Sequence, residues 1–208
     1  MISFEPTEEQ QLVRDSVASF AREQIRPAAR AADESGEIPE GLLRQAWELG
    51  LVQNVIPEQF GGYGDQRSAI TSALVCEELG CGDLSIALHV LAPRLAIYPI
   101  LELGSEAQRQ AVLPDYTGEQ FVAGSAAVVE PRFNFDLDEL TTTATRRNGN
   151  VVLNGTKCYV PLAAAAQHTL VYARGEHGLS AYVVPRGTPG LSVGEREQNM
   201  GLKALATY

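Results

Sequence analysis

The sequence lacks clustered basic residues, and this absence excludes two kinds of partner. Its 208 residues carry 16 Lys and Arg against 26 Asp and Glu, which gives a formal net charge of -10. Nucleic acids and anionic membrane surfaces are bound by grouped Lys and Arg that displace counterions. We therefore expect no nucleic-acid partner and no membrane partner.

Long apolar runs and targeting segments are also missing. The best candidate for a membrane span, residues 84–103, is interrupted by His89, Pro93, Arg94 and Pro99. The first residues lead directly into a helical pattern, without the charged-then-apolar layout of a signal peptide or the Arg-rich layout of a transit peptide. These features predict a cytoplasmic protein.

Cysteine and histidine are scarce, and neither is spaced for metal binding. Cys76, Cys81 and Cys158 match no zinc motif, so no metal site is expected. Free Cys is usually buried, and we expect all three to be buried, reduced thiols. The three histidines lack carboxylate or Cys neighbours at ligand spacing, and we interpret them as ordinary core or surface residues.

The first half of the chain has the period of helices. Thr7 and Gln10 have the spacing of a capping box, which predicts the start of a helix. Further helices are predicted over residues 40–49 with Gly50 as a left-handed cap, over 68–79 closed by Gly80, from Asp83 onward, and over 105–116. The glycine-rich loop 57–64 follows a helix, so we interpret it as a tight turn and not as a phosphate-binding loop.

Near residue 119 the period changes to short β-prone runs. They occupy residues 121–123, 151–153, 169–172, 181–184 and 191–193, with turn residues between them. Asn148-Gly149 predicts a hairpin, because that turn needs positive φ at both central residues. The predicted class is α+β, with an all-α helical domain over residues 1–118 followed by a small antiparallel β-sandwich or barrel over residues 119–208.

Several local strings, in a consistent order, resemble the acyl-CoA dehydrogenase family. They are Pro57–Gly64, Leu103–Gln108, Leu153–Lys157, Gly187–Val193 and Met200–Ala204. Together they cover nearly the whole chain, which resembles the N-terminal helical domain and the central β-domain of that family. The resemblance implies that the β-domain is incomplete at its C-terminal end and that the family's C-terminal helical bundle is absent from this chain.

The resemblance also implies an activity in lipid metabolism. Members of the family are FAD flavoproteins, oxidoreductases that remove hydrogen from the α and β carbons of an acyl-CoA thioester and pass a hydride to the flavin. The expected partners are an acyl-CoA substrate, other chains of the same type in a homo- or hetero-oligomer, and electron-transfer flavoprotein as acceptor. The family's catalytic base comes from the bundle region, so no residue of this chain is assigned as catalytic.

By the same resemblance, two segments contact the flavin. The expected cofactor residues are Ala126, Val128, Val129 and Phe135, with Phe135 also facing substrate, and then Tyr159, Val160 and Pro161. The family pattern has threonine at positions 129 and 161 and serine at 135. Pro161 offers neither a hydroxyl nor an N–H. Each hydrogen bond lost at the flavin edge costs about 1 kcal/mol, which predicts weak FAD binding.

These departures leave three interpretations open. The chain is a catalytic acyl-CoA dehydrogenase with an unusual flavin pocket. Alternatively, it is a non-catalytic partner subunit with a degenerate flavin site in a hetero-oligomeric acyl-CoA dehydrogenase. A third interpretation is a relative that uses the fold for another flavin reaction, such as oxygenation.

Overall fold

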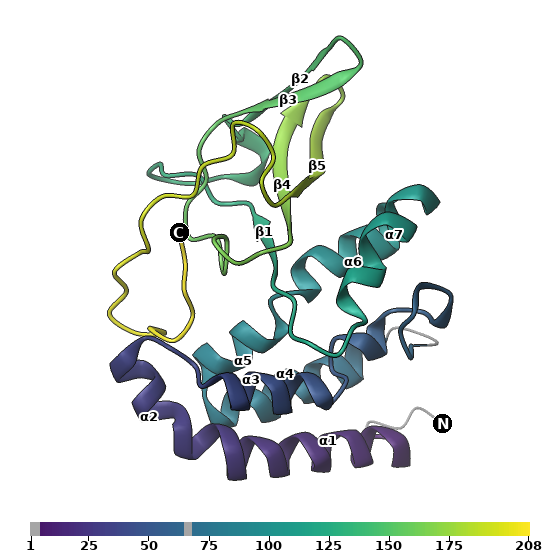
Figure 1. Ribbon diagram of the computed structural model, residues 1–208, viewed down its shortest axis with the longest axis vertical. Coiled ribbons are helices and arrows are strands. Elements are labelled where there is room, and N and C mark those ends of the chain that lie inside the picture. Colours follow the sequence, from purple (N-terminus) through teal and green to yellow (C-terminus); the bar gives the residue numbers. More distant parts are fainter. Residues whose placement is uncertain (1–4, 65–67) are drawn as a thin grey trace. The chain divides into compact units, whose positions relative to one another are not determined.

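The computed structural model describes residues 5–64 and 68–208 and divides into two compact units (Figure 1). The first unit comprises Met1–Leu91, Thr117–Phe121 and Gln198–Leu205. The second comprises Ala92–Tyr116, Val122–Glu197 and Ala206–Tyr208. The expected order of helices first and strands second is confirmed.

The first unit is helical. Its helices are α1 (Glu8–Phe20), α2 (Arg26–Ser35), α3 (Glu40–Glu48), α4 (Ala69–Gly82) and α5 (Leu84–Leu91), with a π-helical turn η1 (Ala21–Ile25) and 3-10 turns η2 (Gln53–Val55) and η3 (Glu58–Phe60). Helices α1 and α4 lie side by side (Figure 1). The core between the helices includes Val17, Ile25, Leu79 and Ile86, and Ala204 packs into it from the returning segment.

Local signals set the ends of these helices. The capping box is confirmed: the Gln10 amide donates to Thr7 Oγ1 at 3.2 Å, and the Thr7 amide donates to Gln10 Oε1 at 3.0 Å. Gly50 follows α3 with φ +67°, as predicted for a left-handed cap. The predicted stop at Gly80 is wrong, because α4 continues to Gly82; a helix tolerates one glycine while the residues beside it stay packed.

The loop at residues 57–64 is a tight turn, as predicted. The Gly64 amide donates to the carbonyl oxygen of Ile56 at 2.9 Å, and Pro57 and Gly64 form an isolated parallel bridge. A Cβ on Gly62 would lie 2.0 Å from that same carbonyl oxygen, so this turn has no space for a side chain. The glycines therefore serve close backbone packing.

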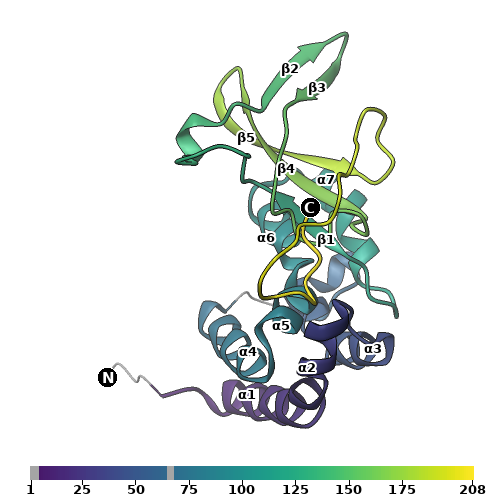
Figure 2. The ribbon, with the colours of Figure 1, turned by 90° about the vertical axis from the view of Figure 1, so that its left-hand side faces the viewer.

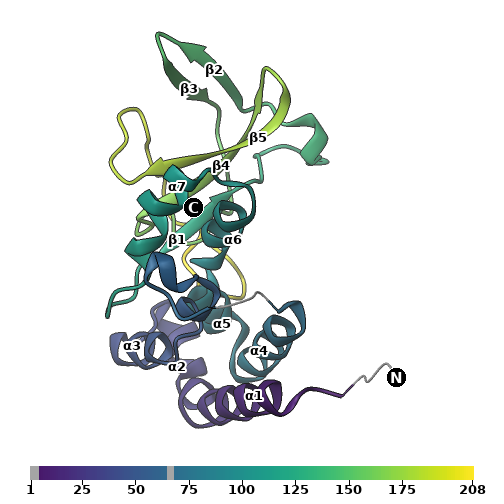
Figure 3. The same ribbon diagram turned by 90° about the vertical axis from the view of Figure 1, so that its right-hand side faces the viewer.

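The second unit combines two helices with a five-stranded sheet (Figures 2 and 3). Its elements are α6 (Arg94–Leu103), α7 (Glu106–Val112), η4 (Leu113–Tyr116), β1 (Gly124–Ala127), η5 (Leu137–Glu139), β2 (Thr143–Arg147), β3 (Asn150–Asn154), β4 (His168–Gly175) and β5 (Gly178–Pro185). The strand order is β1-β4-β2-β3, and β5 pairs with β4. Helix α6 packs against β1.

The sheet is mixed, which corrects the expectation of a purely antiparallel one. The hairpins β2–β3 and β4–β5 are antiparallel, but β1 pairs with β4 in parallel from Gly124↔His168 onward. The long connection between β1 and β4 allows the chain to return to the same end of the sheet, as a parallel pair requires. The predicted turn is confirmed, since Asn148 and Gly149 have φ values of +51° and +81°.

Three sequence expectations failed in detail. The predicted β-prone runs did not include strand β2, the first arm of the predicted hairpin, because its sequence Thr-Ala-Thr-Arg-Arg has no apolar alternation, and residues 121–123 and 191–193 form no strand. Cys76 and Cys81 are exposed and Cys158 is half-buried, so the prediction of buried thiols is wrong. Within α4 the buried positions are taken by Val75 and Leu79, which leaves Cys76 on the solvent face.

Across residues 5–64 and 68–208, no single helix has both the length and the apolar content needed to cross a membrane. Helices α5 and α6 have that length and apolar content only when they are counted together, as a bent pair.

Candidate functional site

The two predicted cofactor segments lie next to each other in the second unit. The Cys158 amide donates to the carbonyl oxygen of Val129 at 3.0 Å. The ammonium group of Lys157 donates to the carbonyl oxygen of Val128 at 2.9 Å. One backbone hydrogen bond and one side-chain hydrogen bond therefore join residues 128–129 to residues 157–158.

The end of the described chain forms a third part of this site, which sequence reasoning did not predict. Val160 and Tyr208 exchange two backbone hydrogen bonds, of 2.9 and 3.1 Å. The Leu162 amide donates to the carbonyl oxygen of Ala206 at 2.8 Å. Residues 206–208 therefore run beside the second cofactor segment as a short antiparallel partner.

Two of the predicted residues have little left to offer a ligand. The Val160 side chain is buried in a small core with Ala127, Val171 and Val184. The carbonyl oxygen of Pro161 already accepts a hydrogen bond from the Ser125 hydroxyl, and proline has no N–H. Position 160 therefore packs inward, and position 161 has no free side-chain donor.

Tyr159 stands out in conformation and exposure. Its side chain is exposed, with 58% of the residue's surface accessible, and its φ is +53°. A bulky residue in the left-handed region is rare and costs about 1–3 kcal/mol unless its surroundings hold it there. The backbone hydrogen bonds of Cys158 and Val160, on either side, supply that restraint. The result is an aromatic ring held at the surface.

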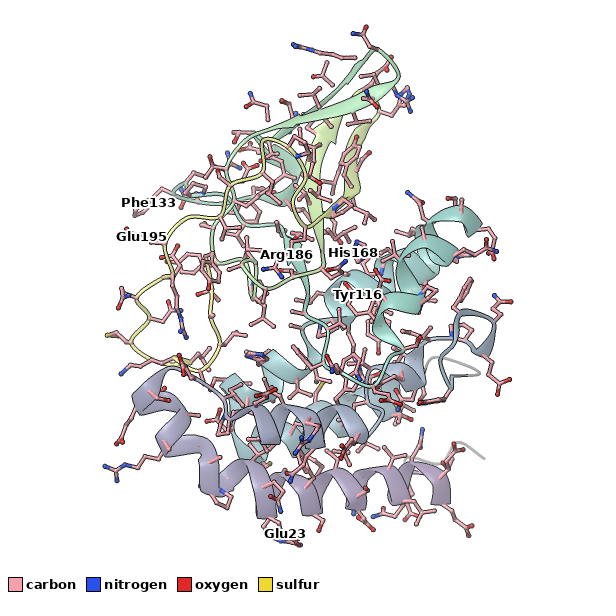
Figure 4. All side chains as sticks on the ribbon, viewed as in Figure 1. Glu23, Tyr116, Phe133, His168, Arg186 and Glu195 are labelled. Atoms are coloured by element: carbon pink, nitrogen blue, oxygen red, sulfur yellow. The ribbon has the colours of Figure 1, made fainter. Side chains whose placement is uncertain are left out.

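The remaining predicted residues are half-buried and apolar. Ala126, Val128, Val129 and Phe135 each keep part of their surface accessible. Phe135 lies on the loop that also carries Phe133, a residue that is 98% exposed and is labelled in Figure 4.

A buried carboxylate lies directly behind the first segment. Glu130 is only 2% exposed and accepts hydrogen bonds from the Thr141 amide and hydroxyl, both at 2.7 Å, and from the Thr142 amide at 2.8 Å. Lys157 Nζ lies 3.1 Å from Glu130 Oε1, and this ion pair is buried on both sides. Sequence reasoning did not predict this pair; its signals in the sequence were the acid in one segment and the lysine in the other.

The charge states of this pair follow from its surroundings. Burial raises the pKa of Glu130, but the hydrogen bonds from Thr142 and Thr141 outweigh burial and hold that pKa well below its usual range. Burial lowers the pKa of Lys157, while the neighbouring Glu130 opposes the shift. The carboxylate is thus ionised at neutral pH and holds a cation beside it.

A second polar cluster lies at the start of β4. His168 Nε2 is 2.8 Å from Asp115 Oδ2, and the fully buried ring of Tyr116 lies 6.0 Å from the imidazole between centroids (Figure 4). Burial raises the pKa of the Tyr116 hydroxyl. This cluster joins η4 to the sheet, in keeping with the interpretation of His168 as an ordinary core residue.

The candidate positions suit one part of a flavin and not another. The exposed Tyr159 ring and the hydrocarbon of Val128 and Val129 match the aromatic body of the ring system. In the arrangement that the resemblance implies, its polar edge would face Val129 and Pro161, which have no side-chain donor, and the Pro161 carbonyl oxygen accepts the Ser125 hydroxyl. The side chains therefore do not fit the hydrogen-bonding edge of the cofactor, and no reaction step through it follows from them.

Comparison with known proteins identifies the class. Residues 7–120 match the acyl-CoA dehydrogenase N-terminal domain, and residues 125–208 match the middle domain. The chain therefore belongs to the acyl-CoA dehydrogenase family, as its local strings predicted.

Individual relatives agree with this assignment. The chain is 35% identical over 202 residues to cyclohex-1-ene-1-carbonyl-CoA dehydrogenase from Geobacter metallireducens, covering 95% of this chain and 53% of the relative. Butyryl-CoA dehydrogenase from Megasphaera elsdenii superposes with a TM-score of 0.86 at 28% identity, covering 99% of this chain and 56% of that one. Glutaryl-CoA dehydrogenase from Mycobacterium smegmatis in complex with FADH2 gives 0.85 at 26% identity, with coverages of 97% and 52%. The chain thus spans about half the length of these relatives.

Proposed function

We propose that this chain belongs to a cytoplasmic FAD-dependent oxidoreductase that introduces an α,β double bond into an acyl-CoA thioester. The observation that carries the proposal is the junction between residues 128–129 and 157–158, where hydrogen bonds join the two segments and the next residue, Tyr159, has an exposed ring. Family membership supports the reaction class, and the relative in complex with FADH2 supports the cofactor. Electron-transfer flavoprotein is the proposed acceptor, and an oligomer of similar chains the proposed assembly.

Within this function, the chain is proposed to provide one wall of the flavin pocket. Ala126, Val128, Val129 and Phe135 from the first segment, and Tyr159 with the backbone of residues 160–161 from the second, form that wall. Phe135 is also proposed to face the acyl group, since its ring adds apolar bulk. We further propose that the boundary between helical and β-domains lies near residue 118.

Flavin content and reduction by substrate test this proposal. The complete oxidoreductase that contains this chain, with the bundle region to which the resemblance assigns the catalytic base, is purified, incubated with FAD, freed of excess cofactor, and examined for flavin absorbance and FAD per chain. Saturated acyl-CoA thioesters, straight and cyclic, are then added without oxygen. We expect bound flavin whose absorbance bleaches with at least one thioester. Bound flavin that no thioester reduces would overturn the proposed reaction.

The donor-poor cofactor surface favours a second candidate function, that of a non-catalytic partner subunit. Val129, Phe135 and Pro161 carry no side-chain hydrogen-bonding group where the family pattern has hydroxyls. Such a chain would remain colourless alone and would form a complex with a flavin-binding chain of the same family. One FAD per two chains in that complex would support this candidate, and one FAD per chain would refute it.

A further inference from the structure

Two segments, residues 141–142 and Lys157, converge on the carboxylate of Glu130. One Glu130 oxygen accepts both donors of Thr141, and the other accepts the Thr142 amide and Lys157 Nζ. Thr142 is in turn tied to β4, because its carbonyl oxygen accepts the Arg174 amide at 2.8 Å. The carboxylate is therefore fully satisfied by hydrogen bonds and anchored to the sheet.

Lys157 links this anchored carboxylate to the second cofactor segment. Its ammonium group bonds to Glu130 Oε1 at 3.1 Å and to the Val128 carbonyl at 2.9 Å, on either side of Val129. The next residue, Cys158, donates its amide to Val129 itself at 3.0 Å. With these bonds in place, residues 128–130 and 157–158 cannot slide along each other.

Burial makes this arrangement rigid. The Lys157 side chain is 8% exposed and that of Glu130 is 2% exposed, so water has little access to compete for either group. A buried ion pair is weak grounds for stability alone, because well-packed apolar residues often replace one at no cost. This pair also bonds to backbone groups, at Thr142 through Glu130 and at Val128 through Lys157. It therefore fixes the position of residues 128–130 relative to residues 157–158.

We propose that Glu130 and Lys157 are positioning residues whose buried ion pair holds residues 128–129 and the exposed ring of Tyr159 in fixed register for cofactor binding. The cofactor part of this inference rests on the proposed function. Neither residue is a catalytic residue, since both act through the segments they hold. The strained φ of Tyr159, +53°, is restrained by the backbone hydrogen bonds of Cys158 and Val160, and the pair holds Lys157, the residue before Cys158, in place for the first of them.

Amide hydrogen exchange on the full chain tests the positioning directly. Lys157→Met removes the ammonium but leaves Glu130 its donors from Thr141 and Thr142, so this variant carries the test should Glu130→Gln fail to fold. Glu139→Gln is the matched control, because Glu139 is 71% exposed and forms an ion pair with Arg132 in the same part of the chain.

We expect exchange in residues 128–136 and 157–162 to accelerate on the order of tenfold or more in Lys157→Met, with α1 and α4 unchanged. The control is expected to match the unmodified protein in all peptides. Equal acceleration throughout the chain would indicate a merely structural role, and no local acceleration would also overturn the proposal.

Flavin affinity provides a second, separable measurement. Small displacements of positioned groups cost on the order of 100-fold, so we expect Lys157→Met to weaken FAD binding about 10–100-fold. If Lys157 acts through Tyr159, combining Lys157→Met with Tyr159→Ala weakens binding no more than the larger single change. Additive losses of affinity would refute the proposal that Lys157 acts on FAD binding through Tyr159. If the unmodified protein binds no FAD, the proposed cofactor function of this chain fails, while the exchange experiment still decides whether the pair positions the segments.

Discussion

Replacing Glu130 by glutamine should destabilise the protein far more than its small change in shape suggests. The substitution leaves the ammonium of Lys157 buried beside the Val128 carbonyl oxygen, without a counter-charge. It also sets an amide N–H₂ group among the donors from Thr141 and Thr142 that the carboxylate now accepts. Removing one member of a buried pair costs about 3–5 kcal/mol.

That cost translates into a measurable shift in thermal unfolding. At roughly 2–4 °C per kcal/mol for a chain of this size, Tm is expected to fall by about 6–20 °C. Glu139→Gln breaks an exposed ion pair, and its expected cost is about 0–1 kcal/mol. Changing both members, in Glu130→Gln with Lys157→Met, should recover part of the loss because no unpaired charge remains.

Urea unfolding followed by two probes checks these values. Trp47 is the sole tryptophan and lies in the first unit, so its fluorescence reports on that unit, whereas far-UV circular dichroism reports on both. For Glu130→Gln, we expect the loss of unfolding free energy to appear in the transition that circular dichroism follows. A loss below about 1 kcal/mol, equal to that of the Glu139→Gln control, would refute the assignment of a buried, uncompensated charge.

Other expectations follow from single features of the structure. The pKa of Glu130 is held below its ordinary 4.5, so the stability that it contributes is present above that pH and is lost as pH falls further; acid titration of the unfolding free energy should be flatter in Glu130→Gln. Gly62→Ala should cost several kcal/mol in urea unfolding, roughly 3 or more, because its Cβ would meet the Ile56 carbonyl at 2.0 Å; an unchanged midpoint would contradict the turn geometry. Tyr159→Asn should keep or slightly raise Tm, since Asn tolerates positive φ, while weakening FAD binding; an unchanged flavin affinity would remove Tyr159 from the site. Thr7→Ala should lower the unfolding free energy by about 1 kcal/mol through loss of the capping box, as measured by urea titration.

Local chemistry accounts for the features that sequence reasoning predicted correctly. The capping box of Thr7 and Gln10 and the turn at Asn148-Gly149 depend on residues within a few positions of each other. Such signals keep their meaning in any fold, because the backbone groups that they satisfy are neighbours along the chain. The order of helices and strands follows from a series of these local patterns, whereas the family was predicted from the local strings that resemble acyl-CoA dehydrogenases.

Contacts over long sequence separations explain what could not be predicted. The parallel pairing of β1 with β4 depends on how a long connection crosses the sheet, and no local pattern records that path. Val160 lies in an apolar string suited to either an exposed or an inward position, and only the packed core turned it inward.

By itself, then, the sequence determined the helical and β-rich halves, the caps and turns, and membership of the acyl-CoA dehydrogenase family. Only the tertiary structure decided that Glu130 and Lys157, 27 residues apart, share a buried contact beside Tyr159. The physical reason is that a charge pair is recognisable as buried only once tertiary packing has removed both groups from water.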